Sequence, residues 1–120
     1  MIPVVFVNCN LYPFIDWIIS GKKQYETRNR NTLKNLVGMT VYLAETGRNH
    51  KPIVKAKATI TEVLPVHTRT EYNRLRSRTQ IRKGSVFDWN SETKVKYLYK
   101  LSNVQPVPEF SPEGIRHGRT

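Results

Sequence analysis

The sequence predicts an α+β fold in which a small mixed or antiparallel sheet curves into a β-barrel and carries about two short helices. Residues 53–64 and 94–104 both alternate between apolar and polar side chains, as half-buried strands do. Only one connection between the predicted strands, the one that ends near Gly21, contains a convincing helix. Because a doubly wound sheet needs a repeated strand–helix–strand pattern, a small barrel fits the sequence better.

The first two elements follow from local patterns. The continuous apolar run over residues 4–7 predicts a buried strand over residues 2–8. A short helix is expected over residues 12–20. Pro13 suits its first turn, and Gly21 suits the left-handed residue that ends a helix.

Three strands are expected in the middle of the chain, over residues 24–29, 40–45 and 53–64. A turn through Asn31 and Gly38 separates the first two. The third strand has small and apolar side chains on one face, namely Val54, Ala56, Ala58 and Ile60. The two alanines predict close packing inside a tightly curved sheet.

The last third of the chain is expected to hold one more helix and one more strand. Thr70 is predicted to cap a helix that runs to about residue 78, with Tyr72 and Leu75 facing inward. The strand over residues 94–104 is predicted to place its apolar residues on one face and its lysines on the other. The apolar set is Val95, Tyr97, Tyr99 and Leu101, and the lysines are Lys94, Lys96 and Lys100. Prolines 106, 108 and 112 predict a tail without regular structure over most of its length.

Length and composition set the class of protein. A chain of 120 residues predicts one domain, residues 1–120. Its apolar runs are too short to cross a membrane, and no signal peptide is recognisable, so an intracellular location is expected (cytoplasm, or nucleus in a eukaryote). Cys9 is the only cysteine and is expected in the core. The three histidines are far apart, so we expect no metal, and we expect no cofactor.

The charge of the chain indicates its partners. Lysine and arginine total 20 against 9 acidic residues, which gives a net charge of +11. Residues 69–83 hold six of these cations, five of them arginine, and Glu71 is the only acid there. Such a balance favours polyanions, so RNA or a nucleotide is the first expected partner. DNA and an acidic protein are alternatives, and no membrane partner is expected. The oligomeric state is left open.

The octet GKKQYETR at residues 21–28 is the most promising functional segment. In a strand, Glu26 and Arg28 share one face and Lys23 points the other way, but a turn at residues 21–23 lets Lys23 rejoin them at one pocket mouth. A carboxylate between two cations can accept a donor from a base edge or a ribose, while the cations favour phosphate or a developing oxyanion. The alternative is an ordinary surface ion pair, which contributes little.

The spacing Gly21-x-Lys23-x-x-Glu26-x-Arg28 resembles the GxKxxExR signature of ASCH domains. The apolar strand and helix before the octet, and the predicted strands after it, also follow the order of that family. The resemblance implies a PUA-like barrel with adjoining helices. It also implies a cleft, lined in part by the octet, that binds RNA or a modified nucleoside.

The resemblance leaves a reaction open. Some relatives are hydrolases that act on acylated cytidine or on RNA, and Lys23 matches a lysine of the amidohydrolases. Glu26 stands where those enzymes have a threonine as the proposed nucleophile. We therefore expect binding first. The alternatives are hydrolysis with Lys23 and Glu26 as catalytic residues, or a basic protein-interaction module in transcription or RNA regulation.

Further residues are expected to complete the cleft. Those beside the predicted strand ends and loops, and those in the basic tail, are Tyr12, Thr46, Arg48, Lys51, Arg116, His117 and Arg119. His117 is the candidate acid or base among them, since histidine titrates near neutral pH. Trp17, Phe87 and Trp89 are expected in the core rather than on a ligand.

Overall fold

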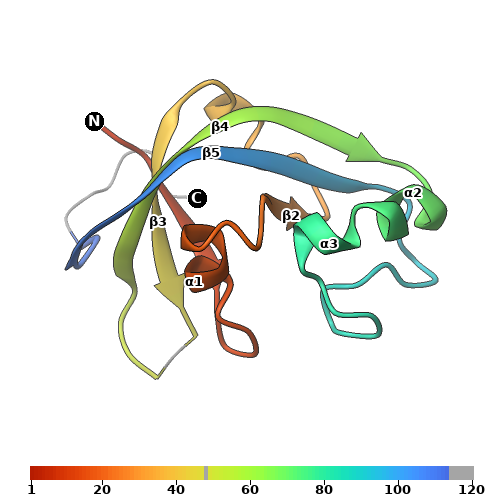
Figure 1. Ribbon diagram of the computed structural model, residues 1–120, viewed down its shortest axis with the longest axis horizontal. Helices are drawn as coiled ribbons and strands as arrows, with labels where there is room; N and C mark the ends of the chain where they lie inside the picture. Colours follow the sequence, from red (N-terminus) through yellow and green to blue (C-terminus); the bar gives the residue numbers. More distant parts are fainter. Residues whose placement is uncertain (48, 114–120) are drawn as a thin grey trace.

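One mixed sheet of five strands dominates the computed structural model, which describes residues 1–47 and 49–113 (Figure 1). The strands are β1 (Val4–Asn8), β2 (Tyr25–Arg28), β3 (Thr40–Thr46), β4 (Ile53–Val66) and β5 (Lys96–Phe110). Their order in the sheet is β1-β3-β4-β5-β2. β1 pairs with β3 in parallel, and the other neighbours are antiparallel. The expected α+β class with a mixed sheet is confirmed.

The sheet is open, with β1 and β2 as its two edge strands, so the predicted closed barrel is not what the structure shows. The long strands β4 and β5 arch side by side over the rest of the molecule (Figure 1). Their pairing shifts register at three places, between Val54 and Ala56, Lys57 and Thr59, and Ile60 and Glu62. Such irregularities increase local bending, which accounts for a strongly curved sheet.

Three short α-helices and a 3₁₀ turn lie in the described residues. They are α1 (Phe14–Ile19), η1 (Lys34–Leu36), α2 (Arg69–Arg74) and α3 (Arg76–Thr79). α1 is shorter than the predicted helix over residues 12–20, and Pro13 precedes it as its N-cap instead of lying in its first turn. Gly21, just beyond the helix, has a φ of +84°, as predicted. The single helix predicted from Thr70 is wrong in two respects. It divides at Leu75, and Thr68 is its cap, because the Thr68 hydroxyl accepts a hydrogen bond from the Glu71 amide at 3.1 Å.

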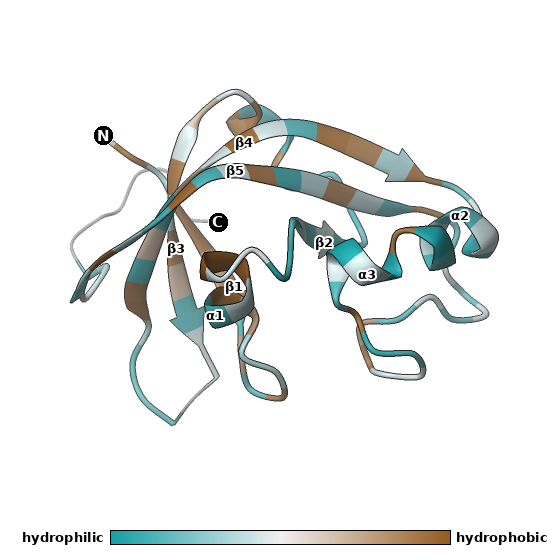
Figure 2. Cartoon of the chain, viewed as in Figure 1, coloured by the Kyte–Doolittle hydropathy of each residue, from teal (hydrophilic) through white to brown (hydrophobic). Residues whose placement is uncertain are grey.

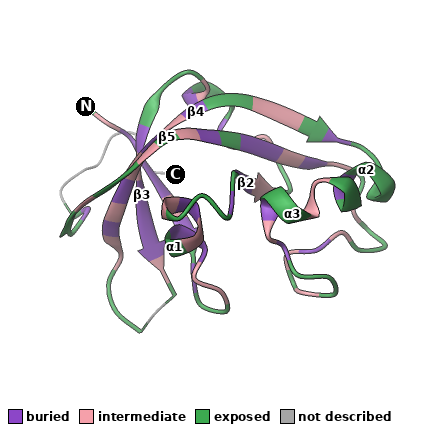
Figure 3. Cartoon of the chain, viewed as in Figure 1, coloured by how far each residue is buried: buried purple, intermediate pink, exposed green. Residues whose placement is uncertain are grey.

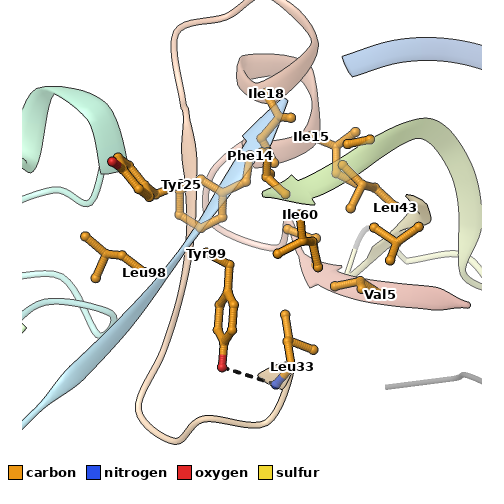
Figure 4. Packing of buried hydrophobic residues seen from close by; sticks show 14 of the residues in the cluster. Val5, Phe14, Ile15, Ile18, Tyr25, Leu33, Leu43, Ile60, Leu98 and Tyr99 are labelled. Carbon is orange, nitrogen blue, oxygen red and sulfur yellow. Dashed lines mark hydrogen bonds between the residues drawn. The ribbon is translucent and has the colours of Figure 1, made fainter. Parts of the chain in front are cut away.

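The core fills the space between α1 and the curved sheet. Phe14, Ile15 and Ile18 on α1 are buried against residues such as Leu43 and Ile60 (Figure 4). The predicted inward face of β4 is confirmed, since its residues 54, 56, 58 and 60 are all buried (Figure 3). Cys9 is also fully buried, as expected. No helix in the described ranges is long and apolar enough to span a membrane.

The predicted facing of β5 is only partly correct. Tyr99 and Leu101 are buried, but so are Lys96 and Leu98 on the opposite face. Both faces are covered here. The Tyr99 hydroxyl donates to Asn31 at 2.6 Å and accepts from the Leu33 amide at 3.1 Å (Figure 4) on one side. On the other side, the Lys96 ammonium contacts the segment that contains Phe87.

The prediction that the prolines end regular structure is wrong for Pro106 and Pro108, which lie within β5. The reason is the place of this segment in the sheet. β2 pairs only with the residues from Tyr97 to Lys100, so the rest of β5 has β4 as its single neighbour in the sheet. A proline lacks an N–H group but is tolerated where a strand forms an edge.

Candidate functional site

A pocket of about 270 Å³ lies between the two edge strands of the sheet. Its wall comes from β1, from β2 and the residue after it, from Phe14 and Lys96, and from the segment before β5. The lining residues are Phe6, Val7, Asn8, Phe14, Glu26, Thr27, Arg28, Asn29, Ile81, Val86, Phe87 and Lys96. The pocket therefore lies where the sheet is open between its two edge strands, a feature that the barrel prediction did not include.

Glu26 and Arg28 form an ion pair in the wall of this pocket. The Arg28 Nη2 atom lies 3.3 Å from Glu26 Oε2 and donates a 2.8 Å hydrogen bond to the Phe6 carbonyl. Glu26 is only 7% exposed, and its other oxygen accepts from the Thr27 amide at 3.3 Å. Arg28 belongs to β2 and Phe6 to β1, so this guanidinium joins the two edges of the sheet.

Lys23 is placed apart from that pair. It is 1% exposed, and its ammonium group donates to the Thr79 carbonyl at 2.5 Å and lies 4.5 Å from the centre of the Phe14 ring. Burial lowers the pKa of Lys23 to about 8, although the negative charge of Glu26 opposes that shift. The turn after α1 thus brings Lys23 within electrostatic range of Glu26 and anchors it to the end of α3 rather than to Arg28.

Lys96 is a pocket residue that the sequence analysis did not select. Its ammonium donates to Asn29 Oδ1 at 2.6 Å and to the Phe87 carbonyl at 3.0 Å, and the residue is 4% exposed. Burial lowers its pKa, and Asp88 opposes the shift. Its alternation with Lys94 and Lys100 indicated a solvent-facing lysine. No signal in one sequence reveals that residues 84–90 cover this end of the strand.

Asp88 organises the segment that carries Val86 and Phe87 into the pocket wall. Its carboxylate accepts from the amides of Gly84 and Trp89, both at 2.8 Å, and pairs with Arg76 at 3.0 Å. Burial alone would raise the pKa of Asp88, but these two amides and the Arg76 guanidinium hold it below its usual value. The pocket wall therefore depends on a carboxylate that does not line the pocket.

The other predicted site residues are dispersed. Tyr12 packs against Phe14 and Phe87, with ring centres 5.5 and 6.4 Å away. The Thr46 hydroxyl donates to the Val7 carbonyl at 3.3 Å. Lys51 is exposed and pairs with Glu113 at 3.2 Å, outside the pocket lining. Arg48, Arg116, His117 and Arg119 lie outside the described residues.

Several aromatic residues expected in the core are only half-buried. Trp17, Phe87 and Trp89 pack against the core without being enclosed, and Phe87 also lines the pocket. Neither the pocket nor any other place in the part of the chain that the structure describes gathers three side chains of the kinds that bind metal ions.

Comparison with known proteins identifies the fold. No protein-family model and no curated protein sequence matches the chain. Among solved structures, it is similar to ASCH from Zymomonas mobilis, with a TM-score of 0.73, 21% identity, and coverage of 90% of this chain and 71% of that one. Two single-substitution variants of that protein match with the same TM-score, at 22% and 21% identity, covering 72% and 73% of those chains. The chain therefore has the fold of an ASCH domain, as the resemblance of its octet implied.

Proposed function

We propose that the chain binds RNA, or a nucleotide or modified nucleoside, by holding a nucleobase in the pocket between β1 and β2. One observation carries the proposal: aromatic walls, a buried carboxylate and two cations converge on one small cavity. Its volume of about 270 Å³ lies just below the usual range for ligand pockets, which suits a single base or nucleoside.

The polar groups of the pocket retain capacity for a ligand. A carboxylate offers about four acceptor positions, and Glu26 uses two of them, for Arg28 and the Thr27 amide. A base edge with an exocyclic amine or a ring N–H can supply the missing donors. Arg28 likewise has donors beyond those bonded to Phe6 and Glu26, and these suit a carbonyl or phosphate oxygen.

Apolar side chains supply the faces against which a planar base can pack. The Phe14 and Phe87 rings meet edge to face with centres 5.5 Å apart, and both line the pocket. Stacking on aromatic side chains is a usual way to hold an unpaired base. The net charge of +11 would favour the phosphates that accompany such a base.

Binding has more support than hydrolysis. Lys23, the catalytic lysine of the alternative, has its ammonium bonded to Thr79 and placed on Phe14, and it does not line the pocket. Thr27 is the one hydroxyl side chain among the residues of the pocket wall. The arrangement therefore favours recognition by fixed donors and acceptors.

The test is a titration of the protein with the four common ribonucleosides, their modified forms and short RNAs. Glu26→Gln should weaken the best ligand about ten-fold, because one acceptor of a charge-assisted bond is replaced by a donor. Glu62→Gln is the matched control, since Glu62 is exposed on β4 outside the pocket. Equal affinities in the two variants, or no binding by the unsubstituted protein, would reject this pocket.

A further inference from the structure

A second hollow, of about 430 Å³, lies beside the pocket, between α1 and the end of α3. We call it the groove. It is lined by Tyr12, Trp17, Lys22, Arg76, Ser77, Gln80, Ile81 and Arg82. The groove draws on the arginine-rich segment 69–83, which the pocket uses only through Ile81.

Two cations in the groove rest on aromatic rings. The Lys22 ammonium lies 4.3 Å from the centre of the Trp17 ring, and the Arg82 guanidinium lies 5.6 Å from the centre of the Tyr12 ring. The two rings are themselves neighbours, with centres 6.2 Å apart. Cation and ring are thus presented together, which is the pairing that proteins use to bind single-stranded nucleic acid.

The charge of the groove is not neutralised locally. Within residues 1–47 and 49–113, neither Lys22 nor Arg82 has an acidic side chain within ion-pair distance, and the groove lining includes no acidic residue. Arg76 differs, because it is paired with Asp88 and also donates to the Ile81 carbonyl at 2.8 Å. Arg76 therefore shapes the groove, while Lys22 and Arg82 keep their charge for a partner.

The groove adjoins the pocket. Ile81 lines both, and Tyr12 of the groove contacts Phe87 of the pocket at 6.4 Å between ring centres. Trp17, Tyr12 and Phe87 form an unbroken series of aromatic contacts from one hollow to the other. Figure 2 shows that the helices α2 and α3, at this end of the molecule, carry mainly hydrophilic residues.

We infer that the groove binds the nucleotides adjacent to the base held in the pocket, so that the ligand is a single strand of RNA rather than a free nucleoside. Lys22 and Arg82 would contact phosphates, and the rings of Tyr12 and Trp17 would support the neighbouring base. The inference rests on the proposed function. The partly exposed rings of Tyr12 and Trp17 favour an unpaired strand over a duplex, whose bases are already stacked.

The experiment compares two double variants that remove equal charge. Lys22→Gln/Arg82→Gln alters the groove and keeps part of each side chain over its ring. Lys34→Gln/Lys100→Gln alters two exposed lysines outside both hollows. Binding of a six-nucleotide single-stranded RNA and of its best mononucleoside is measured for each variant between about 50 and about 200 mM salt, a range over which the Debye length falls by about half.

The groove variant should lose about ten-fold in affinity for the hexanucleotide. For the mononucleoside the loss should be no more than about two-fold, because a nucleoside carries no phosphate for the two cations to neutralise. Its slope of log affinity against log salt should fall by about 1.4, or about 0.7 for each phosphate that is no longer neutralised. The matched control should keep the slope of the unsubstituted protein. The exchange Lys22→Arg/Arg82→Lys should also keep it, because the charges remain.

The outcomes separate this inference from the proposed function. If the hexanucleotide binds and the groove variant behaves like the Lys34→Gln/Lys100→Gln control, the groove is rejected and the pocket stands. If the unsubstituted protein binds neither ligand, the proposed function fails and the groove fails with it. If the groove variant loses both ligands equally, the two hollows do not act as separate subsites and the inference is overturned.

Discussion

The pocket and the groove both combine cations with aromatic rings, but they hold their cations differently. In the pocket, Arg28 and Lys96 donate to fixed acceptors of the protein. In the groove, Lys22 and Arg82 rest on rings, without an ion-pair partner in the described residues. Fixed donors and acceptors suit the reading of a base, and unpaired surface cations suit attraction of phosphates. Under the proposed function, this difference would let one small domain divide the selection of a base and the attraction of phosphates between neighbouring hollows.

The largest effect on stability is expected at Asp88, which supports both the pocket and the groove. Asp88→Ala removes the ion-pair partner of Arg76, which lines the groove. It also removes the acceptor of the Gly84 and Trp89 amides, which fix the segment that carries Phe87 into the pocket. We expect the free energy of unfolding to fall by about 3 kcal/mol, because Arg76 and two amides lose a largely buried partner. Urea denaturation at pH 7 measures the loss.

Glu92→Ala is the control for Asp88→Ala, since Glu92 is exposed in the same segment and its side chain has no ion pair among those the structure describes. It should change stability by less than about 0.5 kcal/mol. The low pKa of Asp88 adds a second check. Its stabilising contribution is present at neutral pH and is lost as the pH falls below about 4, so Asp88→Ala should flatten the acid side of the stability profile. Equal stability of the two variants would contradict the supporting role of Asp88.

The next largest effect is expected on the pH dependence of stability, through the buried Lys23. Lys23 has a pKa of about 8 in the fold against about 10.4 in an unfolded chain. Below pH 8 both states carry the proton, and the cost of burying the ammonium is fully present. Between these two pKa values the folded state loses the proton first, so stability rises with pH. From pH 7 to pH 9.5 the rise due to Lys23 is about 2 kcal/mol.

Lys23→Met should remove that rise while the other titrating groups remain. Denaturation curves of both proteins at pH 7 and pH 9.5 therefore give the contribution of Lys23 as a difference of differences. Lys22→Met, at the exposed neighbouring position, should leave the pH dependence unchanged. A Lys23→Met protein that keeps the full rise would show that the ammonium is charged in the fold well above pH 8.

The sequence predicted most of the scaffold because local patterns carry it. The buried face of β4 follows from strict alternation, and the end of α1 follows from Gly21. The pattern Thr68-x-x-Glu71 is also a capping signal, and the prediction that placed the cap at Thr70 overlooked it. The edge position of the prolines in β5 cannot be predicted from the sequence, since it depends on how far β2 extends along β5.

The sequence predicted less of the candidate site, because its geometry comes from contacts between distant segments. Glu26 and Arg28 share a face through alternation, which one strand can reveal. The burial of Lys96 depends on residues 84–90, and the anchoring of Lys23 depends on Thr79, 56 positions away. The pocket itself lies between β1 and β2, the two ends of an open sheet, and no short sequence pattern encodes that arrangement.

The smallest effect is expected on the free energy of unfolding when a cation of the groove is removed. Lys22→Gln removes the exposed cation that lies over the half-buried Trp17 ring, a contact that contributes about 0.5 kcal/mol at the surface. Lys34→Gln, which removes an exposed lysine elsewhere, should cost close to nothing. Urea denaturation of the two variants at pH 7 and low salt resolves the difference.

A cost near that of Asp88→Ala would instead make Lys22 a structural residue and remove the contrast between the two regions. With the small cost, Lys22 differs from every buried charge of the pocket, because its removal leaves no protein donor or acceptor unsatisfied. Lys22 would then contribute little to stability, and its place over an aromatic ring beside the pocket would be explained by attraction of RNA phosphates. Loss of RNA affinity in Lys22→Gln, with a loss of stability no larger than about 0.5 kcal/mol, is the combined result that distinguishes attraction from support.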